Sequence, residues 1–163
     1  MTIRTGISGW RYPPWRKVFY PPGLPQRREL EYASRRLTSI EINGSFYSLQ
    51  RPESYTTWAA QTPDGFLFSV KGPRFVTHMK KLTDVRVPVA NFFASGVLAL
   101  GPKLGPILWQ LPPNLGFHPD RLGRAVHRRE PGLLVGLRRD HGTTMRRRDD
   151  NACRAPTHGT LPA

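Results

Sequence analysis

Short apolar stretches alternate with helical stretches along residues 3–117 of the chain. The predicted strands cover residues 3–7, 39–43, 66–71 and 106–111. The predicted helices cover residues 27–37, 53–60 and 89–100, and residues 120–127 could open a fourth. Strands and helices in strict alternation are typical of repeated βα units around a parallel sheet.

Four βα units in this order make half of an eightfold barrel. A closed barrel of this kind takes about 250 residues, whereas the chain has 163. No fifth strand is predicted, because the only later apolar run, Leu133-Leu134-Val135, lies between glycines and arginines. We therefore expect a partial barrel over residues 1–122, with two unpaired strand edges that favour aggregation or dimerisation.

Composition changes abruptly after Phe117. All seventeen aromatic residues lie between Trp10 and Phe117, and every lysine lies at or before Lys103. Residues 123–163 are therefore predicted to be a poorly structured, Arg-rich tail, since aromatic side chains supply much of a core's buried area. Either the tail is a natural extension, or it is a frameshift product of a truncated gene. The second alternative is favoured, because out-of-frame codons of a GC-rich gene yield Arg, Ala, Gly, Pro, Thr and His.

The net charge of +14 raises nucleic acid or an anionic membrane as a partner. Residues 1–120 hold 15 Lys and Arg against 7 Asp and Glu, and residues 121–163 hold 10 against 4. Binding to nucleic acid would therefore depend largely on the tail. No apolar run is long enough to span a membrane, and the start lacks the core of a signal peptide, so we expect a soluble, cytoplasmic protein without a membrane partner.

Polar residues gather at the carboxyl ends of the predicted strands. In a barrel, alternate residues of each strand face the lumen, and functional residues lie at the carboxyl ends. This parity brings Glu41, Asn43, Lys71 and Gln110 to one mouth. The carboxylate and the ammonium could act as base and acid on a small polar substrate, with the amides binding it. Alternatively, the group is an internal ion pair that fills the barrel.

His78 follows the third predicted strand and lies on a loop above the same mouth. A histidine there is a candidate catalytic base, and the alternative is a hydrogen-bonded structural histidine. No second histidine or carboxylate stands at metal-ligand spacing, so no metal site is expected, and the cofactor requirement stays unknown. The lone Cys153 can form no internal disulfide.

Aromatic residues cluster in the loop after the first strand, at Trp10, Tyr12, Trp15, Phe19 and Tyr20. They could stack on a ligand above the mouth, or they could form a hydrophobic lid that holds the loop on the barrel. Trp10 and Tyr12 lie nearest the strand end and are the candidate ligand contacts. Signatures of P-loop, dinucleotide-binding, serine-elbow and zinc-protease sites are absent from the sequence.

Several motifs in this order resemble the YecE-like family, domain of unknown function 72. They are Gly6-Ile7-Ser8-Gly9-Trp10-Arg11-Tyr12, Phe19-Tyr20-Pro21, Glu41-Ile42-Asn43-Gly44-Ser45-Phe46-Tyr47, Thr77-His78 and Gln110-Leu111-Pro112-Pro113. The resemblance covers residues 3–122 and implies a TIM-barrel-like fold, but no reaction. It supports the mouth residues without assigning roles to them. Arg16-Lys17 departs from it, standing where the family usually has a glycine, and the Arg-rich tail replaces further βα units.

Three functional hypotheses remain open from the sequence. The first is a barrel enzyme of hydrolase or isomerase type that acts on a polar substrate at Glu41, Lys71 and His78. The second is a nucleic-acid-binding protein that uses its basic charge and the mouth aromatics. The third is a truncated, inactive product, which alone accounts for the break at Phe117.

Overall fold

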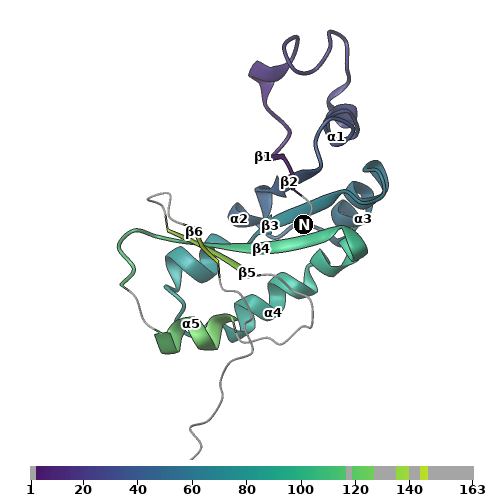
Figure 1. Cartoon of the computed structure of the whole chain (residues 1–163). Coiled ribbons are helices and arrows are strands. Elements are labelled where there is room, and N and C mark those ends of the chain that lie inside the picture. Colours follow the sequence, from purple (N-terminus) through teal and green to yellow (C-terminus); the bar gives the residue numbers. More distant parts are fainter. Residues whose placement is uncertain (1–2, 117–118, 127–134, 140–143, 147–163) are drawn as a thin grey trace, which may run out of the picture.

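The computed structural model describes residues 3–116, 119–126, 135–139 and 144–146 (Figure 1). Within these ranges, one sheet has its strands in sequence order, and each strand from β1 to β4 pairs parallel with the next. The last strand, β6, runs antiparallel to β5. The strands are β1 (Gly6–Ser8), β2 (Ser39–Ile42), β3 (Leu67–Lys71), β4 (Leu104–Leu111), β5 (Val135–Arg139) and β6 (Thr144–Arg146).

Helices and single turns connect the strands, so that the chain is an α/β protein. Figure 1 shows α4 below β4, and the loop that leads into α1 above β1 and β2. The helical elements are η1 (Pro13–Trp15), η2 (Gln26–Arg28), α1 (Glu29–Ser34), α2 (Gly44–Tyr47), α3 (Pro52–Gln61), η3 (Phe75–Met79), α4 (Arg86–Ala94), η4 (Val97–Lys103) and α5 (Pro119–Val126). Pro52 at the first turn of α3 suits a helix start, since that position needs no backbone N–H donor.

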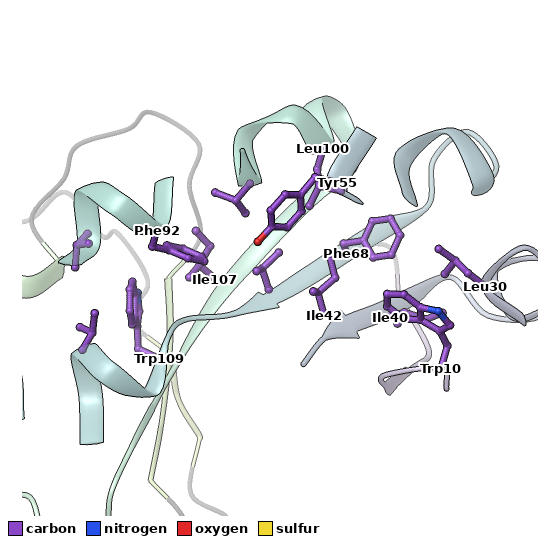
Figure 2. Close-up of a cluster of buried hydrophobic side chains, with 14 of the residues drawn as sticks. Trp10, Leu30, Ile40, Ile42, Tyr55, Phe68, Phe92, Leu100, Ile107 and Trp109 are labelled. Atoms are coloured by element: carbon purple, nitrogen blue, oxygen red, sulfur yellow. The ribbon is translucent and has the colours of Figure 1, made fainter. Parts of the chain in front are cut away.

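The core lies against one face of the sheet, as the alternation of residues predicts. Six strand residues of the predicted apolar parity are buried: Ile40, Ile42, Phe68, Val70, Ile107 and Trp109. Leu30 of α1, Tyr55 of α3, Phe92 of α4 and Leu100 of η4 belong to the same buried cluster (Figure 2). The helices therefore cover this face, and the residues of the opposite parity are left on the other.

The sheet has one irregularity, between β3 and β4. Phe68 pairs with Leu104, but Val70 pairs with Ile107, so β4 holds one extra residue at Gly105-Pro106. Proline cannot donate to a strand ladder, and a bulge is where a sheet accepts it. A side chain at Gly105 would lie 2.8 Å from the carbonyl oxygen of Phe68, so the close strand approach also needs a glycine.

Three sequence predictions are corrected. The prediction of no fifth strand is wrong, because Val135–Arg139 pairs with β4 over five residues. The predicted helix over 89–100 is wrong as a single element, since Gly96 adopts a positive φ of 98° between α4 and η4. The four-residue helix α2 was not predicted. The helix opening predicted at 120–127 is confirmed as α5.

Candidate functional site

The face of the sheet opposite the core carries the polar residues that the parity predicts. Ser8, Glu41 and Ser69 occupy one register row across β1, β2 and β3. Lys71 pairs with Leu108 in a later row, and Gln110 lies beyond it on β4. Glu41, Lys71 and Gln110 are half-buried rather than buried. Their main chains are thus fixed by the sheet, while their side chains keep access to solvent.

Glu41 of β2 is oriented by a residue of the adjacent strand β1. The Oγ of Ser8 donates a hydrogen bond of 2.7 Å to Oε1 of Glu41. A hydroxyl donor orients a carboxylate without neutralising it, so the negative charge remains at the end of β2. Ser8 was not among the predicted site residues, and its role as the partner of Glu41 follows from the register of β1 on β2.

Lys71 is held by an aromatic ring rather than by a carboxylate. Its Nζ lies 4.9 Å from the ring centroid of Phe46, within the range of a cation–π contact. The short helix α2 carries Phe46. Ser45 fixes that helix, because its single hydroxyl proton is shared between the carbonyl oxygens of Ile42, at 3.0 Å, and of Lys71, at 2.6 Å. Sequence reasoning assigned no role to Ser45 or Phe46, although both lie within a motif that it quoted.

Glu41 and Lys71 do not neutralise each other. Lys71 lies two residues beyond the register partner of Glu41, so strand spacing and rise put their Cα atoms roughly 8 Å apart. The ion pairs recorded within the described ranges are Arg16–Glu29, Arg28–Glu31 and Arg35–Glu31. The internal ion pair considered from the sequence is thus not formed between Glu41 and Lys71 in this part of the chain.

The two candidate amides occupy different settings. Asn43 stands between β2 and α2, and its backbone carbonyl accepts a hydrogen bond of 3.2 Å from the N–H of Phe46. Its Oδ1 is buried, and no partner for it lies among the described residues. Gln110 lies opposite Arg138 of β5 in the register. Asn43 therefore holds a buried acceptor without a partner among the described residues, while Gln110 lies on β4 at the wall of the site.

His78 lies in the single turn of π-helix, η3, that follows β3. Its Nδ1 lies 2.8 Å from the Oγ1 of Thr77, and its ring packs edge-on to Phe46 at 5.1 Å between centroids. Phe46 thus touches both His78 and Lys71. No group of three or more His, Cys, Asp or Glu that could hold a metal ion is found in the described ranges.

The aromatic loop packs mainly on itself and on the core. Trp10 is only 8% exposed and meets Trp58 edge-on, with ring centroids 5.3 Å apart. Tyr20 donates a hydrogen bond of 2.6 Å to the carbonyl oxygen of Trp10. Tyr12 is half-buried and donates to the carbonyl oxygen of Ser8, beside Glu41. The burial of Trp10 fits the lid alternative, whereas Tyr12 remains at the edge of the site.

An ion pair between the exposed Arg16 and the buried Glu29 anchors the same loop to α1. The Nε of Arg16 donates a hydrogen bond of 2.9 Å to Glu29, whose side chain is fully buried. Burial, with the nearby charges of Glu29 and Tyr12, raises the pKa of Tyr20 to about 12. Tyr20 therefore stays a hydrogen-bond donor at neutral pH, and it holds the loop above the first strands.

Comparisons with known proteins point to one family. The family model described as "Protein of unknown function DUF72" matches residues 4–141. The chain is 30% identical over 114 residues to the UPF0759 protein YecE of Escherichia coli K12, and the match covers 70% of this chain and 39% of that protein. It is 27% identical over 116 residues to the UPF0759 protein YunF of Bacillus subtilis 168, and that match covers 68% and 40%.

Two crystal structures of a DUF72 family protein, EF0366 of Enterococcus faecalis V583, resemble this fold. One has a TM-score of 0.61 at 16% identity and the other 0.64 at 14%, each with 83% of this chain covered. The matches cover 51% and 50% of those chains. The chain thus spans about two-fifths of the curated relatives and half of the solved structures. No helix in the described residues is long and apolar enough to cross a membrane.

Proposed function

Since the chain belongs to the DUF72 family, which includes the UPF0759 proteins YecE and YunF, we propose that it forms the first βα units of a TIM-barrel-like enzyme. The reaction would be of hydrolase or isomerase type, on a polar substrate. Glu41 and Lys71 would provide the acid–base chemistry at the barrel mouth. This proposal concerns the complete barrel, of which the chain supplies one part of the wall.

One observation carries the proposal: two opposite charges stand on one sheet face, each held by a neutral group. Ser8 orients Glu41, and Phe46 orients Lys71. A carboxylate and an ammonium that form no ion pair with each other can both contact the same substrate. Glu41 would remove or deliver a proton, and Lys71 would stabilise the negative charge that develops on the substrate.

The neighbouring groups would complete the site, Asn43, Gln110 and Tyr12 by contact with the substrate and His78 by acid–base chemistry. Asn43 would contact the substrate from the junction of β2 and α2, although its Oδ1 is buried and has no partner among the described residues. Gln110 would line the far wall on β4, and Tyr12 would close the site from the aromatic loop. His78 would act from the π-helical turn as a second acid or base, because its ring is positioned by Thr77 and Phe46.

Sheet topology supports the barrel. Parallel strands in sequential order, with helices on one face, are what the first units of a βα barrel require. In the complete barrel, further parallel strands would follow β5 in the place that the antiparallel β6 takes here, and they would close the wall against β1. The family match continues to residue 141, past the compositional break at Phe117. The frameshift alternative for the Arg-rich sequence is tested by translating the gene in its other frames beyond codon 117, where it predicts that further βα units are encoded.

The acid–base proposal is tested by binding and by turnover. Ribose 5-phosphate is titrated into the 15N-labelled chain and followed by NMR, with Glu41→Gln, Lys71→Met and the exposed control Glu53→Gln on α3. The two site variants should each weaken binding about tenfold or more, as loss of a charge-assisted hydrogen bond does, and the control should not. In a complete DUF72 relative, the substitutions matching Glu41→Gln and Lys71→Met should abolish turnover of its substrate without unfolding the protein. Equal binding by all four proteins, or unchanged turnover, would overturn the proposal.

A further inference from the structure

A groove opens beside the candidate site, between α2, η3 and α4. Its volume is about 220 Å³. The residues that line it are mostly apolar, and those that matter here are Phe46, Tyr47, Leu49, Phe75, Val76 and Asn91. Both α2 and η3 follow the carboxyl ends of strands, so the groove lies at the same end of the sheet as Lys71.

Large hydrophobic side chains are exposed along this groove. Tyr47 is 67% exposed, Leu49 48% and Phe75 43%, and each of them lines it. Single exposed hydrophobic residues are common on soluble proteins, but several that border one hollow are typical of a binding site. The groove is therefore a place where an apolar group would gain by leaving water.

Phe46 joins the groove to the candidate acid–base site. It lines the groove, and it also contacts the ammonium of Lys71 and the ring of His78. A molecule seated in the groove thus touches the ring that positions both groups. No charged residue is among the described residues that line the groove, and the ammonium of Lys71 lies over the ring of Phe46, which does line it.

We propose that this groove seats an aromatic or branched aliphatic group of an anionic substrate, whose charged group contacts Lys71. The inference rests on the proposed function and names its substrate class. Size supports it: a cavity of about 150 Å³ is sufficient for benzene, so about 220 Å³ accommodates one ring with a short substituent. A purely polar substrate would leave Tyr47, Leu49 and Phe75 exposed.

The test compares two anionic probes that differ in their apolar group. Methyl phosphate and phenyl phosphate are titrated into the full chain by isothermal calorimetry, with the wild type, Lys71→Met and Asn91→Trp. Asn91 is exposed on α4 and lines the groove, so a tryptophan there would fill it. Thr57→Trp, at an exposed position of α3 outside the groove, is the matched control.

Phenyl phosphate should bind the wild type about tenfold more tightly than methyl phosphate, the gain expected when roughly half of a phenyl ring's surface leaves water. Asn91→Trp should abolish that gain and leave methyl phosphate binding unchanged, and Thr57→Trp should alter neither. Lys71→Met should weaken both probes.

Three results would overturn the inference, and they separate it from the proposed function. In the first, methyl phosphate binds through Lys71 and phenyl phosphate binds no more tightly. In the second, phenyl phosphate still binds more tightly than methyl phosphate in Asn91→Trp. Either result shows that the groove is not the apolar subsite, while the acid–base proposal stands. If neither phosphate binds at millimolar concentration, then the assignment of Lys71 as the anion contact fails, and the groove proposal fails with it.

Discussion

Gly72 follows β3 and lies directly beneath the indole of Trp109, so that replacing it with alanine tests the packing at the end of the sheet. A Cβ at this position would lie 2.3 Å from Cε3, 2.5 Å from Cζ3 and 2.8 Å from Cδ2 of Trp109. The indole has little freedom to move, because Trp109 is 4% exposed and packs edge-on against the fully buried Phe92, at 5.8 Å between ring centroids.

The cost of Gly72→Ala follows from two opposing effects. Overpacking of a well-filled core costs about 1–3 kcal/mol. Replacing glycine also restricts the unfolded chain, which returns about 0.4–1 kcal/mol where the backbone tolerates the new residue. The net loss in the free energy of unfolding should therefore be about 1–2 kcal/mol, measured by urea titration with far-ultraviolet circular dichroism.

A matched control and a double variant make the reasoning refutable. Gly44→Ala should cost nothing, because its Cβ would meet only the Gln50 side chain, at 3.5 Å. Trp109→Leu should remove the clash, so that Gly72→Ala costs markedly less in that background than in the wild type. Equal stability of Gly72→Ala and Gly44→Ala, or the same cost of Gly72→Ala in both backgrounds, would show that the indole is not rigidly held.

Three further predictions concern the aromatic loop and α1. Lys17 has a φ of 68°, in the left-handed region that glycine adopts without strain. Lys17→Gly should stabilise the chain by about 0.5–1 kcal/mol, because the backbone strain that it relieves exceeds the entropy that glycine adds to the unfolded chain. A lower midpoint of thermal unfolding would contradict this. Tyr20→Phe should cost about 1–3 kcal/mol at pH 8, because the buried carbonyl of Trp10 loses its donor. The pKa of Tyr20 is raised from 10.0 to about 12. The stability that its hydroxyl adds relative to Tyr20→Phe is therefore fully present below pH 10 and should decline between pH 10 and 12. A constant difference between wild type and variant over this interval would refute the prediction. Two arginines that hydrogen-bond to Glu31 lower its pKa from 4.5 to about 2; the stability difference between the wild type and Glu31→Gln should therefore be present above pH 4.5 and disappear towards pH 2, and urea midpoints across this range measure it.

The alternation of residues was enough to predict the two faces of the sheet. Side chains of a strand point to opposite faces in turn, so Ile40 and Ile42 had to lie opposite Glu41 once the strand was recognised. Burial of the first two and partial exposure of the third confirm this. The same rule placed Lys71 and Gln110 correctly, because it depends only on local geometry and not on which strands are neighbours.

The fifth strand shows where local patterns stop being informative. Val135–Arg139 contains a glycine and two arginines, and its two apolar residues, Val135 and Leu137, are too few to predict a strand. Its pairing with β4 depends on hydrogen bonds to residues about thirty positions earlier in the chain, and a parallel edge offers those bonds to many sequences. The bulge at Gly105-Pro106 could not be predicted either. Pro106 shows that regular pairing is excluded at this point, but not which irregular pairing the sheet adopts instead.

Phe46 explains why the candidate site could be predicted only in part. The residues with chemical groups were found from strand parity, but the element that joins Lys71 to His78 is an apolar ring from a four-residue helix. That helix is fixed by a single hydroxyl, on Ser45, which bonds to the ends of β2 and β3 together. Such a contact exists only after the two strands are adjacent. The orientation of Lys71 is therefore a property of the assembled sheet, and a substitution at Ser45 would alter the site although Ser45 touches neither Glu41 nor His78 in the recorded contacts.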